Sequence, residues 1–383
     1  MRLRAAILGA LLGAVAAVWA DDEYESGFLT APLNRSIARA MEYETPGDGD
    51  TLQYGREVTR YASAPQFGGF IVGQYSYSDQ AGQHGGDGFN AHYARAYVSG
   101  TLLRDFRYRL QMEFRGSPAM RDYFIEWSHW TEFSAKVGQF KVPFTFDSPL
   151  NPWDVGLGGY SLATRHLVGY NDYSGAPNTN GRDQGLLFQG NLLPVGTARR
   201  CLIHYEAGIF NGNGINRADN NRKKDWIGNI QLRPIDGLRI GLFGWRGTYT
   251  QSGIDVRRNR WALGATYEKE GWTARAEYIH HTGHRLSDYD ATTRTWSGNA
   301  EADGWYALLG VPVTRWFTSF LRYDTYRDDG RWSNRTNAYS LCPNFRLHKN
   351  LLFQLQYNHI DDQSATAGDR HYNEFWAQAY IRF

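Results

Sequence analysis

The stretch FWAQAYIRF, residues 375–383, alternates between two kinds of side chain with a period of two. Its odd-numbered residues are all apolar, and its even-numbered residues are polar or amphipathic. Because successive side chains of a strand point to opposite faces, this pattern predicts a strand with one apolar and one amphipathic face. Chain ends usually fray, so a strand that keeps its phase up to Phe383 must be held by a partner.

The same alternation recurs from residue 67 onward. RYRLQMEFR (residues 107–115), CLIHYEAGI (residues 201–209) and LLFQLQYN (residues 351–358) each place apolar residues on one face and polar residues on the other. A period of two is the strand signal. Sixteen such segments are predicted, and they start near residues 67, 89, 105, 121, 133, 183, 200, 225, 237, 257, 271, 301, 315, 335, 350 and 370.

The connections between these segments alternate between short and long. Residues 103–105 and 269–271 form tight turns, whereas residues 142–182 and 283–300 form long connections. A connection around Thr250 is expected in the long set, and the short residues 116–120 fit that set least well. Segments of about 9 to 13 residues are long enough for a tilted strand to cross a bilayer, and a membrane barrel carries tight turns on one rim and long loops on the other.

These patterns predict an all-β fold, a 16-stranded antiparallel transmembrane β-barrel with an inward-folding third loop. The last strand must pair with the first, because closure removes sheet edges that lipid cannot satisfy. A barrel of this width is expected to have no apolar core to fill. Five tryptophans near strand ends are therefore assigned to girdles at the membrane interfaces: Trp127, Trp130, Trp226, Trp261 and Trp272.

Residues 1–20, MRLRAAILGALLGAVAAVWA, have two arginines, an apolar run and small residues before an acidic stretch. This is the plan of a secretory signal peptide, with a single membrane anchor as the alternative. The predicted organisation is a signal peptide at 1–20, an N-terminal arm at 21–66 and a barrel at 67–383. The polar arm is interpreted either as periplasmic or as a disordered lead-in.

Composition excludes several classes of protein. The 41 basic and 39 acidic residues nearly balance, so a nucleic-acid partner, which calls for a clustered basic excess, is not expected. Beyond residue 20 no apolar run approaches the roughly 20 residues of a membrane helix. The mean hydropathy of −0.56 is modest, yet 13 Trp, 25 Tyr and 20 Phe form a large aromatic content. Cys201 and Cys342 fall on nearly opposite strands of the predicted ring, too far apart for a disulfide.

GQFKVPF (residues 138–144), followed after the long connection by GRDQG (residues 181–185), resembles the phosphate-selective porin O and P family. Residues 94–114 and GIFNGNG (residues 208–214) look like two further stretches of that family. The resemblance implies sixteen strands, an inward third loop and a homotrimer. It also implies a place in the outer membrane of a Gram-negative bacterium, among outer-membrane lipid and lipopolysaccharide, with passive uptake of inorganic anions such as phosphate and no cofactor.

Cationic side chains are the candidate site of an anion pathway. A loop as long as residues 142–182 is usually functional, and cations on it can focus the field on an entering anion because the wall has a low dielectric constant. A solvated loop that merely packs on the rim is the alternative. The candidates for the constriction and the anion pathway are Lys141, Arg165, His166, Arg182, Arg95, Arg109 and Arg115.

The predicted lumen face carries carboxylates as well as arginines, so mixed charge is expected there. Arg109 or Arg115 is expected to pair with Glu126 across neighbouring strands. A general or weakly cation-preferring porin is therefore an alternative function. A non-conducting barrel that acts as a surface anchor or adhesin is another.

Metal and enzyme chemistry are not expected. Adjacent histidines on a strand point to opposite faces, so only His280 with His284, or His281 alone, could converge on a metal, and no third ligand is evident. His359 and His371 lie near the predicted external rim with Asp361 and Asp362, but no serine motif of a nucleophilic enzyme accompanies them.

Overall fold

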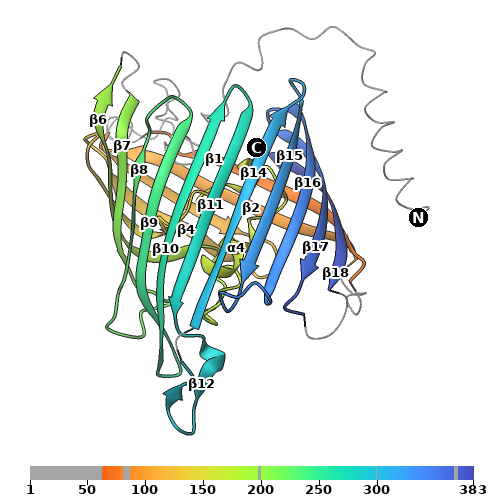
Figure 1. Ribbon diagram of the computed structural model, residues 1–383. Helices are drawn as coiled ribbons and strands as arrows, with labels where there is room; N and C mark the ends of the chain where they lie inside the picture. Colours follow the sequence, from red (N-terminus) through yellow and green to blue (C-terminus); the bar gives the residue numbers. More distant parts are fainter. Residues whose placement is uncertain (1–62, 81–86, 197–199, 299, 366–369) are drawn as a thin grey trace, which may run out of the picture. The chain divides into compact units, whose positions relative to one another are not determined.

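The computed structural model describes residues 63–80, 87–196, 200–298, 300–365 and 370–383, and in these residues sixteen antiparallel strands form one closed barrel (Figure 1). The predicted signal peptide at 1–20 and most of the predicted arm at 21–66 lie outside the described residues. The all-β fold and the strand number predicted from the sequence are confirmed for the described part of the chain.

Each barrel strand begins within three residues of a predicted start. The strands are β1 (Gln66–Ser78), β2 (Gly88–Leu102), β3 (Phe106–Glu113), β4 (Ala119–Trp127), β5 (Ser134–Lys141), β6 (Arg182–Val195), β7 (Arg200–Phe210), β8 (Asp225–Leu232), β9 (Leu238–Gln251), β10 (Ile254–Lys269), β11 (Trp272–Gly283), β14 (Ala300–Pro312), β15 (Phe317–Arg327), β16 (Arg335–His348), β17 (Leu351–Asp362) and β18 (His371–Arg382). Between β11 and β14, the short strands β12 (Tyr289–Asp290) and β13 (Thr295–Trp296) form a separate hairpin after the 3-10 helix η2 (Leu286–Asp288).

Strand β18 closes the barrel against β1. Tyr380 lies opposite Val72 in the antiparallel register. The N–H of Gly69 donates to the carbonyl of Phe383 over 2.8 Å, and the N–H of Phe383 donates back over 3.0 Å. The partner that the final stretch required is therefore the first strand, as predicted.

Tight turns lie on one rim, called here the tight-turn rim, and the longer connections lie on the other, called the long-loop rim. Glu270 and Gly271 join β10 to β11 with φ of 53° and 83°, the positive values that suit a two-residue hairpin turn. The prediction of a long loop around Thr250 is wrong. Ser252 and Gly253 join β9 to β10 with φ of 52° and 80°, so a second tight turn lies on the long-loop rim.

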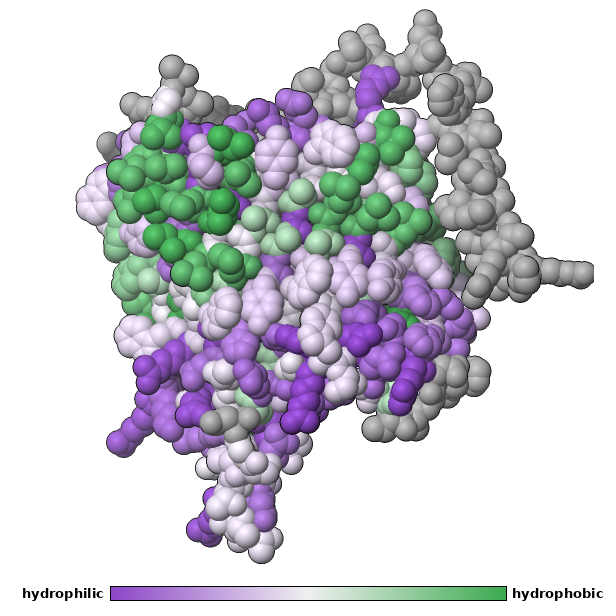
Figure 2. Space-filling view, in the orientation of Figure 1, coloured by the Kyte–Doolittle hydropathy of each residue, from purple (hydrophilic) through white to green (hydrophobic). Residues whose placement is uncertain are grey.

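The two faces of the wall differ as the alternation predicts. On β11 the side chains of Arg275, Glu277 and His281 are buried on the inner face, whereas Trp272 is 46% exposed on the outer face. Figure 2 shows apolar surface gathered over the upper part of the strands and hydrophilic surface toward the β12 hairpin. Trp226 and Trp261 are also exposed on the outer face, as the girdle assignment requires. None of the helices in the described residues is long and apolar enough to cross a membrane.

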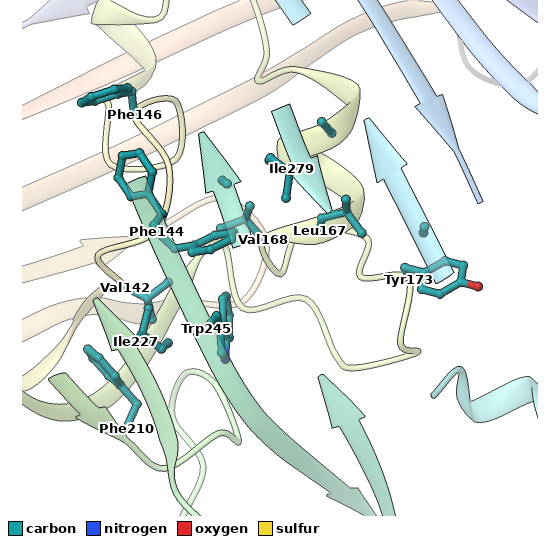
Figure 3. Close-up of a cluster of buried hydrophobic side chains, with 14 of the residues drawn as sticks. Val142, Phe144, Phe146, Leu167, Val168, Tyr173, Phe210, Ile227, Trp245 and Ile279 are labelled. Carbon is teal, nitrogen blue, oxygen red and sulfur yellow. The ribbon is translucent and has the colours of Figure 1, made fainter. Parts of the chain in front are cut away.

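Residues 142–181, called here the third loop, fold into the barrel and carry the 3-10 helix η1 (Pro152–Asp154) and the helix α4 (Leu162–Leu167). Figure 3 shows apolar side chains of this loop, among them Phe144 and Leu167, beside Trp245 and Ile279 of the wall. The expectation that the lumen has no apolar core is therefore wrong. The loop brings its own apolar side chains inside, and burying them against the inner wall removes them from water.

Candidate functional site

The base of the third loop is fixed to β11 by one carboxylate. Glu277 accepts hydrogen bonds from the N–H groups of Phe146 and Asp147, over 2.6 and 2.8 Å. The hydroxyl of Tyr306 donates a third hydrogen bond to Glu277 over 2.6 Å. Because all these groups are buried, the carboxylate satisfies backbone donors that would otherwise lack a partner.

The middle of the third loop reaches the strands near the closure of the barrel. Gly158 N–H donates to Gln356 over 2.6 Å, and the Asn344 side chain donates to the carbonyl of Gly156 over 2.9 Å. Arg322 donates to the carbonyl of Gly159 over 2.8 Å. The loop therefore crosses the lumen from β5 to β15, β16 and β17 and divides the interior into cavities.

Helix α4 places two of the predicted residues, Arg165 and His166. Ser161 caps the helix, since its hydroxyl accepts a hydrogen bond from the N–H of Thr164 over 3.2 Å. The His166 ring stacks on Tyr326 with centroids 4.3 Å apart. Burial, with a smaller contribution from the neighbouring Arg165, lowers the pKa of His166 from 6.5 to about 4. The imidazole is therefore neutral at pH 7, and His166 is not one of the cations.

A cavity of about 190 Å³, called here the inner cavity, brings four of the seven predicted residues together. Its cationic side chains are Arg95, Arg109, Lys136, Lys141 and Arg182. The carboxylates of Asp122 and Glu206 also line it, so cations outnumber carboxylates. Sequence reasoning missed Lys136, whose parity with Ser134 and Phe140 on β5 could have revealed its inward direction.

Four of these cations are held by protein groups, and one of them is Lys136, which lies 3.6 Å from Glu126. Arg95 donates to Glu113 over 2.8 Å, and Arg182 donates to Asp122 over 2.8 and 3.1 Å. Lys141 donates to three oxygens of the third loop: the carbonyls of Ser148 (2.5 Å) and Leu150 (2.7 Å) and the hydroxyl of Tyr160 (2.9 Å). Lys141 is therefore well placed to fix the path of the loop.

Arg109 is arranged differently. Its guanidinium carbon lies 3.9 Å from the centroid of the Tyr97 ring, and no hydrogen bond or ion pair joins Arg109 to the described residues. Its predicted pairing with Glu126 is wrong, because Glu126 accepts from Gln189 over 2.6 Å and lies 3.6 Å from Lys136. Arg109 therefore has no direct ion pair among the described residues, and its charge attracts that of Asp122 across the inner cavity.

The alternative pairing of Arg115 with Glu126 is also wrong. Arg115 follows β3 at the long-loop rim, and its side chain donates to the carbonyl of His92 over 3.1 Å. It does not line the inner cavity. The third loop and the strand curvature therefore bring only part of the predicted cation set together.

Two further cavities lie at other positions in the barrel. One of about 530 Å³, called here the loop cavity, is lined by Arg165 and His166 among other residues. One of about 570 Å³, called here the turn-side cavity, is lined by four arginines and three carboxylates: Arg107, Arg200, Arg233, Arg239, Glu126, Asp236 and Glu268. The inner and turn-side cavities share Gln189, so a cationic lining extends toward the tight-turn rim.

The histidines considered as metal ligands point apart. His280 lies near Glu301, 3.5 Å away, whereas His281 is buried beside Arg260 and accepts from its Nε over 3.1 Å. His284 stacks on Trp296 with centroids 4.1 Å apart. The two cysteines lie on β7 and β16 and do not form a disulfide.

No protein-family model matches the chain, and no curated protein matches its sequence. Solved structures match the fold. An anion-selective porin from Comamonas acidovorans matches with a TM-score of 0.64 at 14% identity, over 84% of this chain and 99% of that one. The outer membrane channel DcaP of Acinetobacter baumannii matches with a TM-score of 0.59 at 12% identity, over 85% of this chain and 98% of that one.

The trimer form of in-vitro folded OmpT, an outer membrane protein of Vibrio cholerae, matches with a TM-score of 0.57 at 10% identity, over 84% of this chain and 99% of that one. At such low identity these matches establish a common fold, that of outer-membrane porins, and nothing finer. The resemblance to the phosphate-selective family stays a prediction.

Proposed function

We propose that this protein is an outer-membrane porin through which small hydrophilic solutes diffuse passively, with a preference for anions such as phosphate. The observation that carries the anion preference is the inner cavity, where five cationic side chains face two carboxylates. Its cationic lining extends into the turn-side cavity, where four arginines face three carboxylates. A wall of low dielectric constant strengthens the attraction between such charges and an entering anion.

Arg109 is the residue best placed to contact a permeating anion. Its guanidinium lies over the Tyr97 ring, which fixes the plane while the N–H edges remain available to a ligand. Arginine binds phosphate and carboxylate oxygens in this way, through two parallel hydrogen bonds. Lys141, whose hydrogen bonds go to uncharged oxygens, contributes to the field around Arg109. Arg95, Lys136 and Arg182 are each paired with a carboxylate and contribute less.

The setting of the proposal is the outer membrane of a Gram-negative bacterium, reached through export directed by residues 1–20. Lipid and lipopolysaccharide would contact the apolar outer face, and the long-loop rim would face outward. A homotrimer is proposed because the similar OmpT structure is a trimer form. An enzymatic role is not proposed, since the similar structures named as porins or channels support diffusion.

Two other functions are favoured by specific observations. The loop cavity carries five carboxylates (Asp172, Asp324, Asp328, Asp362 and Glu374) against three arginines (Arg165, Arg285 and Arg322), which favours a weakly cation-preferring porin. The third loop fills much of the lumen with buried side chains, which favours a non-conducting anchor.

One experiment separates the three functions. The purified protein is inserted into a planar bilayer between two concentrations of KCl, and the reversal potential is measured. A sign that reports chloride as the more permeant ion supports the anion porin. A potassium-selective sign supports the cation porin, and the absence of any conductance from folded protein supports the anchor.

A further inference from the structure

The loop cavity differs from the inner cavity in both charge and shape. Its volume is about 530 Å³, and its wall combines helix α4 and the end of the third loop with the inner faces of β15, β16, β17 and β18. Cavities of this size suit small organic ligands.

Most of its charged groups are used within the protein. Arg322 pairs with Asp324 over 2.6 Å, and Asp172 pairs with Arg260 over 2.6 Å. Arg285 lies 3.7 Å from Asp328. These pairs cancel, and three charges remain: the guanidinium of Arg165 and the carboxylates of Glu374 and Asp362.

The remaining carboxylates lie on neighbouring strands. Glu374 of β18 is opposite Asn358 of β17 in the register, and the Asn358 side chain donates to it over 3.1 Å. Asp362, at the end of β17, accepts hydrogen bonds from the hydroxyls of Thr336 (3.0 Å) and Ser364 (2.5 Å). Both carboxylates are therefore held in place by neutral donors, and neither forms an ion pair with a cation of the described residues.

Arg165 supplies the opposite charge. Its side chain is exposed on α4, lines the same cavity and forms no hydrogen bond or ion pair with the described residues. It is close enough to Glu374 for their charges to attract. Among the described lining residues, the cavity thus holds one cation and two carboxylates that have no ion pair.

Aromatic side chains complete the wall. Tyr372 and Trp376 lie two residues before and after Glu374, so all three share the inner face of β18. An organic ammonium group is bound well by carboxylates beside aromatic faces, and a ligand carboxylate is bound well by a guanidinium. Aromatic rings also offer apolar contact to the body of such a ligand.

We infer that the loop cavity binds a small zwitterion whose ammonium group meets Glu374 and Asp362, whose carboxylate meets Arg165, and whose apolar body contacts Tyr372 and Trp376. Aromatic amino acids belong to this chemical class. The inference goes beyond anion diffusion, and it does not require that the pore conduct.

The test measures equilibrium binding of L-phenylalanine to the folded, detergent-solubilised full chain by titration calorimetry at pH 7. Phenethylamine keeps only the ammonium group, and 3-phenylpropionate keeps only the carboxylate. Both are expected to bind at least about tenfold more weakly, because each lacks one charge-assisted contact.

The variants resolve the two ends of the ligand. The double variant Glu374→Gln with Asp362→Asn is expected to weaken the binding of L-phenylalanine and of phenethylamine at least about tenfold. Arg165→Gln is expected to weaken the binding of L-phenylalanine and 3-phenylpropionate. It should not weaken the binding of phenethylamine, which has no carboxylate. Glu301→Gln, a carboxylate 58% exposed at its side chain on β14, is the matched control and should bind like the wild type.

Retention of the compact, heat-modifiable gel band shows that each variant is folded. Absence of saturable L-phenylalanine binding to the folded wild type overturns the inference, as does equal affinity in wild type and both variants. Binding of sucrose at the affinity of L-phenylalanine, insensitive to the charge variants, also overturns it and assigns the cavity to neutral hydroxyl-rich solutes. Conductance measurements test the porin function separately, so the two failures are distinguishable.

Discussion

The guanidinium of Arg182 donates two hydrogen bonds to the carboxylate of Asp122, over 2.8 Å and 3.1 Å. Arg182 begins β6 directly after the third loop, and Asp122 lies on β4, 60 residues earlier in the chain. A third N–H of the same guanidinium donates to the carbonyl of Asn180 over 3.1 Å. The pair therefore fixes the end of the third loop to the wall, and its two charges largely cancel within the inner cavity.

Arg109 and the pair of Arg182 with Asp122 are expected to affect ion selectivity differently. Arg109→Gln should lower the ratio of anion to cation permeability about fivefold, because a unit charge about 4 Å from an ion in water is worth about 1 kcal/mol. The double variant Arg182→Gln with Asp122→Asn removes a cation and an anion together and should leave the ratio near its wild-type value. Reversal potentials in a salt gradient measure both. An equal decrease of the permeability ratio in the two variants would show that Arg109 is not the residue that sets the ion selectivity.

Glu277 is expected to hold the base of the third loop. Glu277→Gln exchanges one acceptor oxygen for an N–H donor, so one of the buried N–H groups of Phe146 and Asp147 loses its partner. The expected loss in the free energy of unfolding is about 1.5 to 3 kcal/mol, the range for hydrogen bonds to charged groups. Urea unfolding of the detergent-solubilised barrel measures it. Glu270→Gln, in the tight turn after β10, is the control and should unfold at the wild-type midpoint.

His166 is expected to make stability depend on pH. Its pKa is lowered to about 4 in the folded protein from 6.5, so the unfolded chain binds a proton more tightly. The contribution of neutral His166 to the free energy of unfolding is fully present above about pH 6.5, and it is lost as the pH falls toward about 4.

The expected loss in the free energy of unfolding is at most about 3 kcal/mol for such a pKa shift, and solvent screening makes it smaller. His166→Gln should remove this part of the pH dependence. Unfolding midpoints of both proteins between pH 4 and 7 provide the measurement, and parallel curves would contradict the prediction. At pH 7 the variant should keep the wild-type reversal potential, because the imidazole carries no charge there.

Gly69 is expected to be needed for closure of the barrel. A Cβ at Gly69 would lie 2.4 Å from the carbonyl oxygen of Arg95 and 2.7 Å from the Phe383 ring, whereas a Cβ at Gly73 of the same strand would meet nothing within 4 Å. Gly69→Ala should therefore cost about 1 to 3 kcal/mol through overpacking, and Gly73→Ala should not. The folded fraction after refolding into detergent measures the difference. Equal yields of the two variants would show that β1 shifts to make room.

Residue patterns along the chain were sufficient to locate the barrel strands because strand alternation is a local property. Each predicted start falls within three residues of an observed strand. The largest difference between a predicted and an observed strand start is at β10. Ser252 and Gly253 have positive φ and form a tight turn, so β9 and β10 both extend closer to the turn than the polar sequence suggested. The same alternation placed Glu277 and Arg275 on the inner face.

The candidate site was less predictable because pairing of charges is not local. Nothing in the sequence around Arg182 indicates that Asp122 neutralises it, or that Glu126 contacts Lys136 in place of Arg109. His166 looks cationic in the sequence and is neutral once buried against Tyr326.

The sequence by itself determined a closed sheet with a polar inner face, since a period of two sets the direction of each side chain relative to its neighbours. Only the tertiary structure decided which cations are paired with a carboxylate and which are not. The path of the third loop sets the distances between groups on different strands, and electrostatic attraction depends on those distances and on burial. Lys141 donates hydrogen bonds to oxygens of the third loop, while Arg109 lies over the Tyr97 ring and has no hydrogen bond to the described residues.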